Sequence, residues 1–81
     1  MKSSKKNDEE VLRKLKEIGE KVRSIRKQQY KNYEDFAKAF KINKVTISRL
    51  ENGENTTLMT FIEVLSALNV TLEEFFAEFK P

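Results

Sequence analysis

The stretch that decides the fold is residues 32–53, NYEDFAKAFKINKVTISRLENG. Asn32 and Asn43 are of a residue type favoured at helix N-caps, so each is expected to open a short helix. Gly53 suits the positive φ that commonly ends a helix, and it closes the second of the two. Because only about three residues, beginning with Lys41, join the helices, they must cross steeply. The stretch therefore predicts a helix-turn-helix motif.

The second helix of this motif is predicted to have two unlike faces. At about 100° per residue, Ile47 and Leu50 fall on one face, with Thr46 at its border. The other face carries an ammonium group, a methyl-bearing side chain, a hydroxyl and a guanidinium, from Lys44, Val45, Ser48 and Arg49. In the DNA major groove, Arg or Lys can pair with guanine O6 and N7, and an apolar group can contact the thymine methyl. The pattern favours DNA reading, and a solvated helix face without a binding role is the alternative.

Apolar residues recur at spacings of three and four along the chain, and the only Gly and Pro residues are Gly19, Gly53 and Pro81. This pattern predicts an all-α fold of five helices in a compact bundle, without strands. The first helix is expected to run from about Asp8 to Gln29. Its apolar seam consists of Val11, Leu15, Ile18, Val22 and Ile25.

The other helices are predicted from a cap and a buried stripe. In the helix that follows Asn32, the stripe is Phe36, Ala37 and Phe40. A fourth helix follows the cap Thr57, ends at Asn69, and carries Leu58, Phe61, Ile62, Leu65 and Leu68. A fifth opens with a capping box of Thr71 and Glu74, and carries Leu72, Phe75, Phe76 and Phe79.

Length and composition exclude several classes of protein. Eighty-one residues suit one compact domain, and we expect residues 1–7 to be a basic flexible arm and residues 8–81 a single domain. The absence of Cys and His argues against a metal site, a cofactor and an enzyme. No apolar run reaches the ~20 residues of a membrane span, and the first residues do not resemble a secretory signal. We therefore expect a cytoplasmic protein.

The net charge of +3 conceals an uneven distribution along the chain. Residues 1–31 hold eleven Lys or Arg against five acids, a balance of +6. Residues 32–81 hold five against eight, a balance of −3. A chain polarised in this way can present a basic face to a polyanion and keep an acidic back, and an ordinary solvated surface is the alternative.

Several runs of the chain together resemble a known family. They are Ile18-Gly19, Val22-Arg23, Ile25-Arg26, Glu34-Asp35-Phe36-Ala37, the run VTISRLENG from Val45 to Gly53, and the run TLEEFF from Thr71 to Phe76. On these runs, residues 18–76 resemble the Cro and phage-repressor type of helix-turn-helix domain, also called the xenobiotic-response-element family. The resemblance implies a lambda-repressor-like five-helix bundle, here with an N-terminally extended first helix, in a bacterial or phage regulator.

The resemblance also implies roles for individual residues. Base contacts are expected from the start of the helix that follows Asn43, at Lys44, Val45, Ser48 and Arg49. Contacts to the DNA backbone are expected from Asn43, Asn52, Tyr33, Lys41 and Arg26. For Arg26 an ion pair with an acid such as Glu51 is an equally good interpretation.

Tyr33 and Lys41 are among the positions that depart from the family pattern. Tyr33 stands where the family usually has a glutamine that grips the DNA backbone, so that contact passes to a phenol hydroxyl or is lost. Lys41 stands where the family usually has the glycine of the turn, so we expect a strained left-handed conformation there or a tighter turn.

The two ends of the chain carry further predictions. Lys2, Lys5 and Lys6 could form an arm that contacts phosphates or enters the minor groove, and a tail without a role is the alternative. Three phenylalanines within five residues exceed what a small core needs, which suggests a two-fold homodimer. The interface is expected at Leu72, Phe75, Phe76 and Phe79. Such a dimer would set two recognition helices about one DNA turn, ~34 Å, apart.

The function predicted from these observations is a sequence-specific transcriptional regulator that binds double-stranded DNA, with repression by operator occupancy as the simplest mechanism. The alternative is an antitoxin, which binds a toxin protein and represses its own operon. A second small protein that co-purifies with the chain would favour the alternative.

Overall fold

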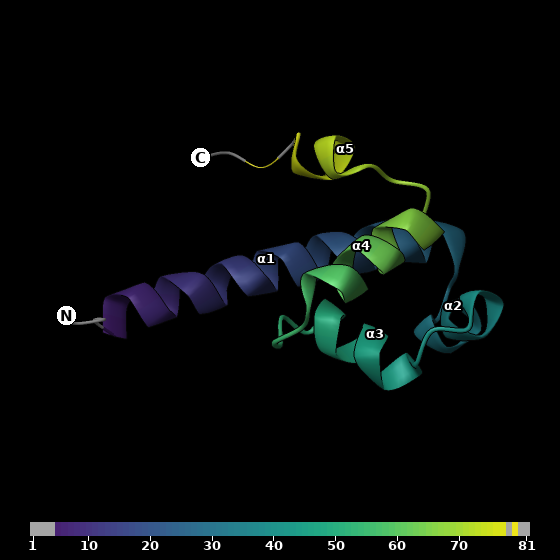
Figure 1. Ribbon diagram of the computed structural model, residues 1–81, viewed down its shortest axis with the longest axis horizontal. Coiled ribbons are helices and arrows are strands. Elements are labelled where there is room, and N and C mark those ends of the chain that lie inside the picture. The colour runs from purple at the N-terminus through teal and green to yellow at the C-terminus, as the bar shows by residue number, and fades with distance from the viewer. Residues whose placement is uncertain (1–4, 78, 80–81) are drawn as a thin grey trace.

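In the computed structural model, which describes residues 5–77 and 79, five α-helices follow one another along the chain (Figure 1). They are α1 (Lys5–Gln29), α2 (Tyr33–Phe40), α3 (Lys44–Glu51), α4 (Leu58–Ala67) and α5 (Leu72–Phe76). The all-α five-helix fold predicted from the apolar spacing is confirmed. None of the helices within the described residues is long and apolar enough to cross a membrane.

The first helix is the longest element, with 25 residues. At ~1.5 Å per residue it is roughly 37 Å long, so it outreaches the other helices. Figure 1 shows its N-terminal half projecting beyond the helices that pack on its C-terminal half. It begins at Lys5, so the predicted arm of residues 1–7 is already helical from Lys5 onward. Lys2 lies outside the described residues.

The predicted caps open the later helices. The side chain of Asn32 accepts a hydrogen bond from the backbone N–H of Asp35 at 2.9 Å, and that of Thr57 accepts one from Thr60 at 3.1 Å. At α5 the capping box is complete, because Thr71 accepts from the N–H of Glu74 at 3.0 Å while the Glu74 carboxylate accepts from the N–H of Thr71 at 2.9 Å. These local signals set the helix boundaries.

The core draws residues from all five helices. Its buried hydrophobic members are Val22, Phe36, Ala37, Ile47, Leu50, Phe61, Val64, Leu65, Leu68 and Phe75. The prediction that Phe40 is buried is wrong, because this residue ends α2 and is 40% exposed, although its ring contacts those of Phe36 and Tyr30. Val11 is also exposed, at 57%, since it lies on the projecting half of α1.

A close crossing of α1 and α3 sets the position of the second helix of the motif. A Cβ atom built on Gly19 would lie 2.5 Å from the carbonyl oxygen of Leu50 and 2.7 Å from that of Glu51. Only a residue without a side chain lets the two backbones approach this closely. Gly19, whose helix propensity is poor, therefore fixes the distance between α1 and the C-terminal end of α3.

Candidate nucleic-acid interface

The turn between α2 and α3 is built on Lys41. This residue has φ 56° and ψ 42°, the left-handed conformation expected where the family usually has glycine. The backbone N–H of Ile42 donates to the carbonyl of Ala37 at 3.0 Å, which satisfies the end of α2. Ile42 packs on the core and thereby anchors the turn. The chain then enters α3 at Lys44, in a new direction.

The structure places the four predicted base-contact residues on the outer side of α3. The side chains of Lys44 and Arg49 are 59% and 64% exposed, and Val45 is 52% exposed. Ser48 is half-buried. The opposite side of the helix carries Ile47 and Leu50, which are buried in the core. The two-faced helix predicted from the sequence is therefore present.

Asn43 caps the N-terminal end of α3, opposite the end that crosses α1 at Gly19. Its side-chain oxygen accepts hydrogen bonds from the backbone N–H groups of Val45 at 2.8 Å and Thr46 at 3.4 Å. Because the oxygen is used in this way, the exposed amide NH₂ is the part of Asn43 that can donate to a phosphate.

Asn52 lies just past the other end of α3 and is linked to α1. Its side-chain oxygen accepts a hydrogen bond from Arg23 Nη2 at 3.0 Å, and its NH₂ lies 3.5 Å from Ser48 Oγ. Arg23, whose side chain is 44% exposed, also reaches Glu51 at 3.3 Å. Sequence analysis noted Arg23 only as part of the family resemblance and did not foresee this role. A cation therefore stands beside the expected phosphate contact.

Arg26 is buried and lies outside the exposed surface, so it is not placed to make the DNA backbone contact expected from the resemblance. The residue is 3% exposed, and its guanidinium pairs with Glu51, which is 4% exposed. Arg26 Nη1 also donates to the carbonyls of Tyr30 and Lys31, at 3.1 and 3.0 Å. The alternative interpretation, an ion pair with Glu51, describes its position.

The two remaining residues expected to contact the DNA backbone, Lys41 and Tyr33, differ in their exposure to solvent. Lys41 is exposed beside the start of α3. Tyr33 is half-buried and packs against the core. Tyr33 therefore serves partly as a packing residue at the position where the family usually has glutamine.

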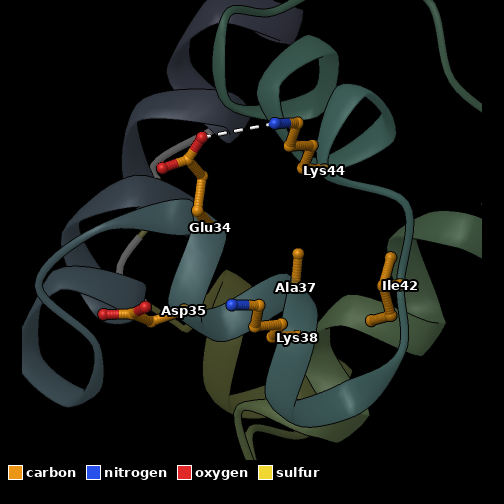
Figure 2. Close-up of a pocket in the computed structure, with 6 residues that line it drawn as sticks. All are labelled: Glu34, Asp35, Ala37, Lys38, Ile42 and Lys44. Atoms are coloured by element: carbon orange, nitrogen blue, oxygen red, sulfur yellow. Dashed lines mark hydrogen bonds and ion pairs between the residues drawn. The ribbon is translucent and has the colours of Figure 1, made fainter.

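A cleft of about 430 Å³ opens between α2 and the beginning of α3. Its lining residues are Glu34, Asp35, Ala37, Lys38, Ile42 and Lys44. Figure 2 shows Glu34 and Lys44 facing one another across the mouth of this cleft, with Lys44 Nζ 3.3 Å from Glu34 Oε2. An acid therefore lies directly beside one of the expected base-contact residues.

Both cations of the outer α3 face have an acidic neighbour. Lys44 pairs with Glu34, and Arg49 Nε lies 3.8 Å from Glu54 Oε1. The side chains of both pairs are more than half exposed, and such pairs contribute only ~0–1 kcal/mol. The cations can therefore exchange these partners for DNA at little cost. The sequence did not reveal that Glu34 and Glu54 pair with these cations, because each pair depends on how the elements of the folded chain meet.

The residues predicted for a dimer interface divide into two groups. Leu72 and Phe76 are 45% and 41% exposed and remain available. Phe75 is fully buried and is a core residue, so its assignment to an interface is corrected. Phe79 is half-buried, with its ring stacked on that of Phe75 at 5.4 Å between centroids. Thus α5 contributes Phe75 to the core and leaves Leu72 and Phe76 at the surface.

Two further findings concern what the site binds. Within residues 5–77 and 79, no group of three or more acidic, His or Cys side chains could hold a metal ion. Residues 22–75, 54 of the 81, match a family model described as Helix-turn-helix, of the Cro/C1 type. No curated protein and no solved structure matches the chain. The matched span contains all the expected DNA contacts except the three lysines of the arm.

Proposed function

Since the chain belongs to the Cro/C1-type helix-turn-helix family and is thereby a DNA-binding transcription regulator, we propose that it is a repressor that occupies an operator read by α3. The observation that supports this proposal is the outer side of α3, where Lys44, Val45 and Arg49 are all more than half exposed. The buried opposite side holds the helix rigidly on the core, as a reading surface requires.

Each residue of this face has a distinct role in the proposal. Lys44 and Arg49 donate to O6 and N7 of guanine, and Val45 contacts a thymine methyl. Ser48, whose hydroxyl both donates and accepts, meets a base edge or a phosphate.

The DNA backbone is held from both ends of α3. Asn43 and Lys41 approach a phosphate at the beginning of the helix, and Asn52 approaches one at its end. Arg23 adds a cation beside Asn52. Arg26 acts indirectly, because its buried pair with Glu51 holds α3 in place.

Repression follows from occupancy, because a protein bound over a promoter excludes the polymerase. A two-fold homodimer would present two copies of α3 to successive major grooves, ~34 Å apart, and thus recognise a palindromic site.

Selection of bound sequences from a random duplex pool tests the proposal. The expected result is enrichment of a short palindrome, and transcription in vitro from a promoter that carries this sequence should fall as protein is added. A pool that stays random after repeated rounds would contradict operator reading. Enrichment followed by increased transcription would retain the DNA reader and reject the repressor.

A further inference from the structure

Six large apolar side chains are exposed on α1, α4 and α5, four of them around one cavity and two on the N-terminal half of α1. They are Val11, Leu12, Leu58, Ile62, Leu72 and Phe76, and each is between 41% and 76% exposed. We call these residues the apolar flank. If each contributes on the order of 100 Å², the flank exposes roughly 600 Å², at the upper limit for the largest patch of an ordinary monomer. On so small a domain, a surface of this size is a candidate interaction site.

The apolar flank surrounds a cavity of about 380 Å³. Leu15, Ile18 and Phe61 are among its better-covered lining residues, while Leu58, Leu72 and Phe76 form its exposed rim. The cavity lies between α1, α4 and α5, on the side of α1 that also packs on the core. An apolar side chain from outside could enter it.

The projecting half of α1 carries side chains suited to enter such a cavity. Val11 stands four residues before Leu15 and seven before Ile18, so it continues the seam that lines the cavity. Val11 and Leu12 are exposed because nothing in the described chain covers this part of α1 (Figure 1). A straight helix cannot fold back onto its own flank, so these residues can reach only the cavity of another molecule.

The charges of the two surfaces are complementary. Residues 11–16, VLRKLK, hold three cations and no acid. Arg13 and Lys14 pair with Glu10 and Glu17 of the same helix, at 3.6 and 3.7 Å, but such exposed pairs contribute only ~0–1 kcal/mol and can be exchanged for a partner's acids. Residues 54–77, which include α4 and α5, hold four acids, Glu54, Glu63, Glu73 and Glu74, and no cation. A basic apolar segment and an acidic apolar rim on the same chain favour a second copy of that chain as the partner.

We propose that a second copy of this chain occupies the cavity, with residues 11–16 of each protomer lying across the α4–α5 rim of the other. The contact is isologous, because residues 11–16 of each protomer meet the same rim on the other. This inference rests on the proposed function, whose palindromic site calls for two copies of α3.

The exposed area is adequate for such a dimer. A standard interface buries ~800 Å² per partner, of which up to ~65% is apolar, or ~500 Å². The apolar flank alone offers roughly that much. The segment that α1 contributes to this contact, residues 11–16, precedes the family match, which begins at residue 22.

Equilibrium sedimentation of the full chain without DNA, from about 1 to 100 µM, tests this proposal. The wild-type chain should be dimeric in this range, and Leu12→Ser and Leu72→Ser should each weaken self-association at least tenfold. Both residues are exposed, so circular dichroism should show both variants folded. Val45→Ser is the matched control, because it removes an exposed apolar side chain outside the flank and should leave the dimer unchanged.

Mixing the two variants distinguishes this dimer from one made by α5 alone. The Leu12→Ser protomer keeps an intact rim and the Leu72→Ser protomer keeps an intact α1 segment, so the mixture should associate more tightly than either variant alone. A wild-type monomer at 100 µM overturns the proposal, as does a Leu12→Ser dimer of wild-type strength. A wild-type monomer that instead co-purifies with a second small protein assigns the flank to a toxin-like partner and overturns it as well.

DNA binding is measured separately, so the two proposals can fail independently. A monomer that still enriches a half-site sequence refutes the dimer and leaves the DNA reader intact. A stable dimer that enriches no sequence refutes the DNA reader and leaves the interface intact.

Discussion

The guanidinium of Arg26 donates two hydrogen bonds to the carboxylate of Glu51, from Nε to Oε2 at 2.9 Å and from Nη2 to Oε1 at 2.8 Å. Arg26 stands near the end of α1, and Glu51 is the last residue of α3. Both residues are buried, so the pair ties α3 to the long helix α1 inside the domain. The face of α3 that we propose reads DNA is thus oriented by a buried contact on the opposite side of the helix.

Replacing Arg26 with alanine should destabilise the domain by ~3–5 kcal/mol, because the Glu51 carboxylate would stay buried without its partner. This loss is a large part of the ~5–15 kcal/mol stability of a typical domain, so the variant should be partly unfolded at 25 °C. Urea denaturation followed by circular dichroism measures the change in the free energy of unfolding.

The double variant Arg26→Met/Glu51→Leu tests whether the lost stability comes from the unpaired buried charge or from the loss of the ion pair itself. Apolar replacements of similar volume leave no buried charge, so the double variant should recover much of the stability lost in Arg26→Ala. The carbonyls of Tyr30 and Lys31 lose a donor in both variants, so recovery should be incomplete. A loss below about 1 kcal/mol in the single variant would contradict a structural role for the pair.

Gly19→Ala should destabilise the domain by ~1–3 kcal/mol, even though alanine is the better helix former by ~1 kcal/mol. The added methyl group would lie 2.5 Å from the Leu50 carbonyl oxygen, so α1 and α3 must separate. Ser24→Ala, at an exposed position of the same helix, is the matched control and should be neutral or slightly stabilising. Thermal unfolding of both variants checks this, and equal melting temperatures would refute the close crossing.

Lys41→Gly should stabilise the domain by about 1 kcal/mol, since glycine adopts the left-handed conformation without the steric cost that a side chain carries. Lys38→Gly, three residues earlier inside α2, loses the same charge and should destabilise the domain by a similar amount. Urea denaturation should therefore show a higher free energy of unfolding for Lys41→Gly and a lower one for Lys38→Gly. Destabilisation by both variants would show that the turn does not hold Lys41 in this conformation.

The helix boundaries could be predicted from the sequence because their signals are local. Asn32, Thr57 and Thr71 each bond to a backbone group three residues later, so the cap and its partner lie in one short segment. The left-handed turn at Lys41 was one of two expectations drawn from the resemblance, because the family usually has glycine at this position. Apolar spacing similarly identified the inner side of α3.

Pairings between helices could not be predicted in this way. Glu34 meets Lys44, and Arg23 meets Asn52, only after α1, α2 and α3 have packed. Arg26 had two chemically reasonable partners, phosphate or an acid, and only its burial decides between them. Similarly, the spacing of three phenylalanines does not reveal that Phe75 turns inward while Phe76 stays at the surface.

Lys44→Ala and Arg49→Ala should each weaken binding to the selected sequence by ~1–3 kcal/mol, or roughly 5- to 150-fold, if the side chain contacts a base edge. Binding to unrelated duplexes should fall much less. Fluorescence anisotropy titrations with both duplexes give the two affinities. Equal losses on both duplexes would reassign the residue to the phosphate backbone.

The variant Lys5→Ala/Lys6→Ala provides a contrast to the base-contact variants, because it removes two charges at the N-terminal end of α1. If these lysines contact phosphates, the salt dependence of log K should become shallower by roughly 2, while sequence preference stays the same. An unchanged slope would show that this end of α1 lies away from DNA.

The most direct test of the account is the ratio of affinities for the selected duplex and for a scrambled duplex of equal length and composition. The measurement is an anisotropy titration of the wild-type chain at ~150 mM salt, where electrostatic binding without sequence preference is weakened. We predict that the selected duplex binds ~10³-fold more tightly or better, and that Lys44→Ala and Arg49→Ala reduce this ratio. Equal affinity for the two duplexes would contradict the claim that α3 reads an operator.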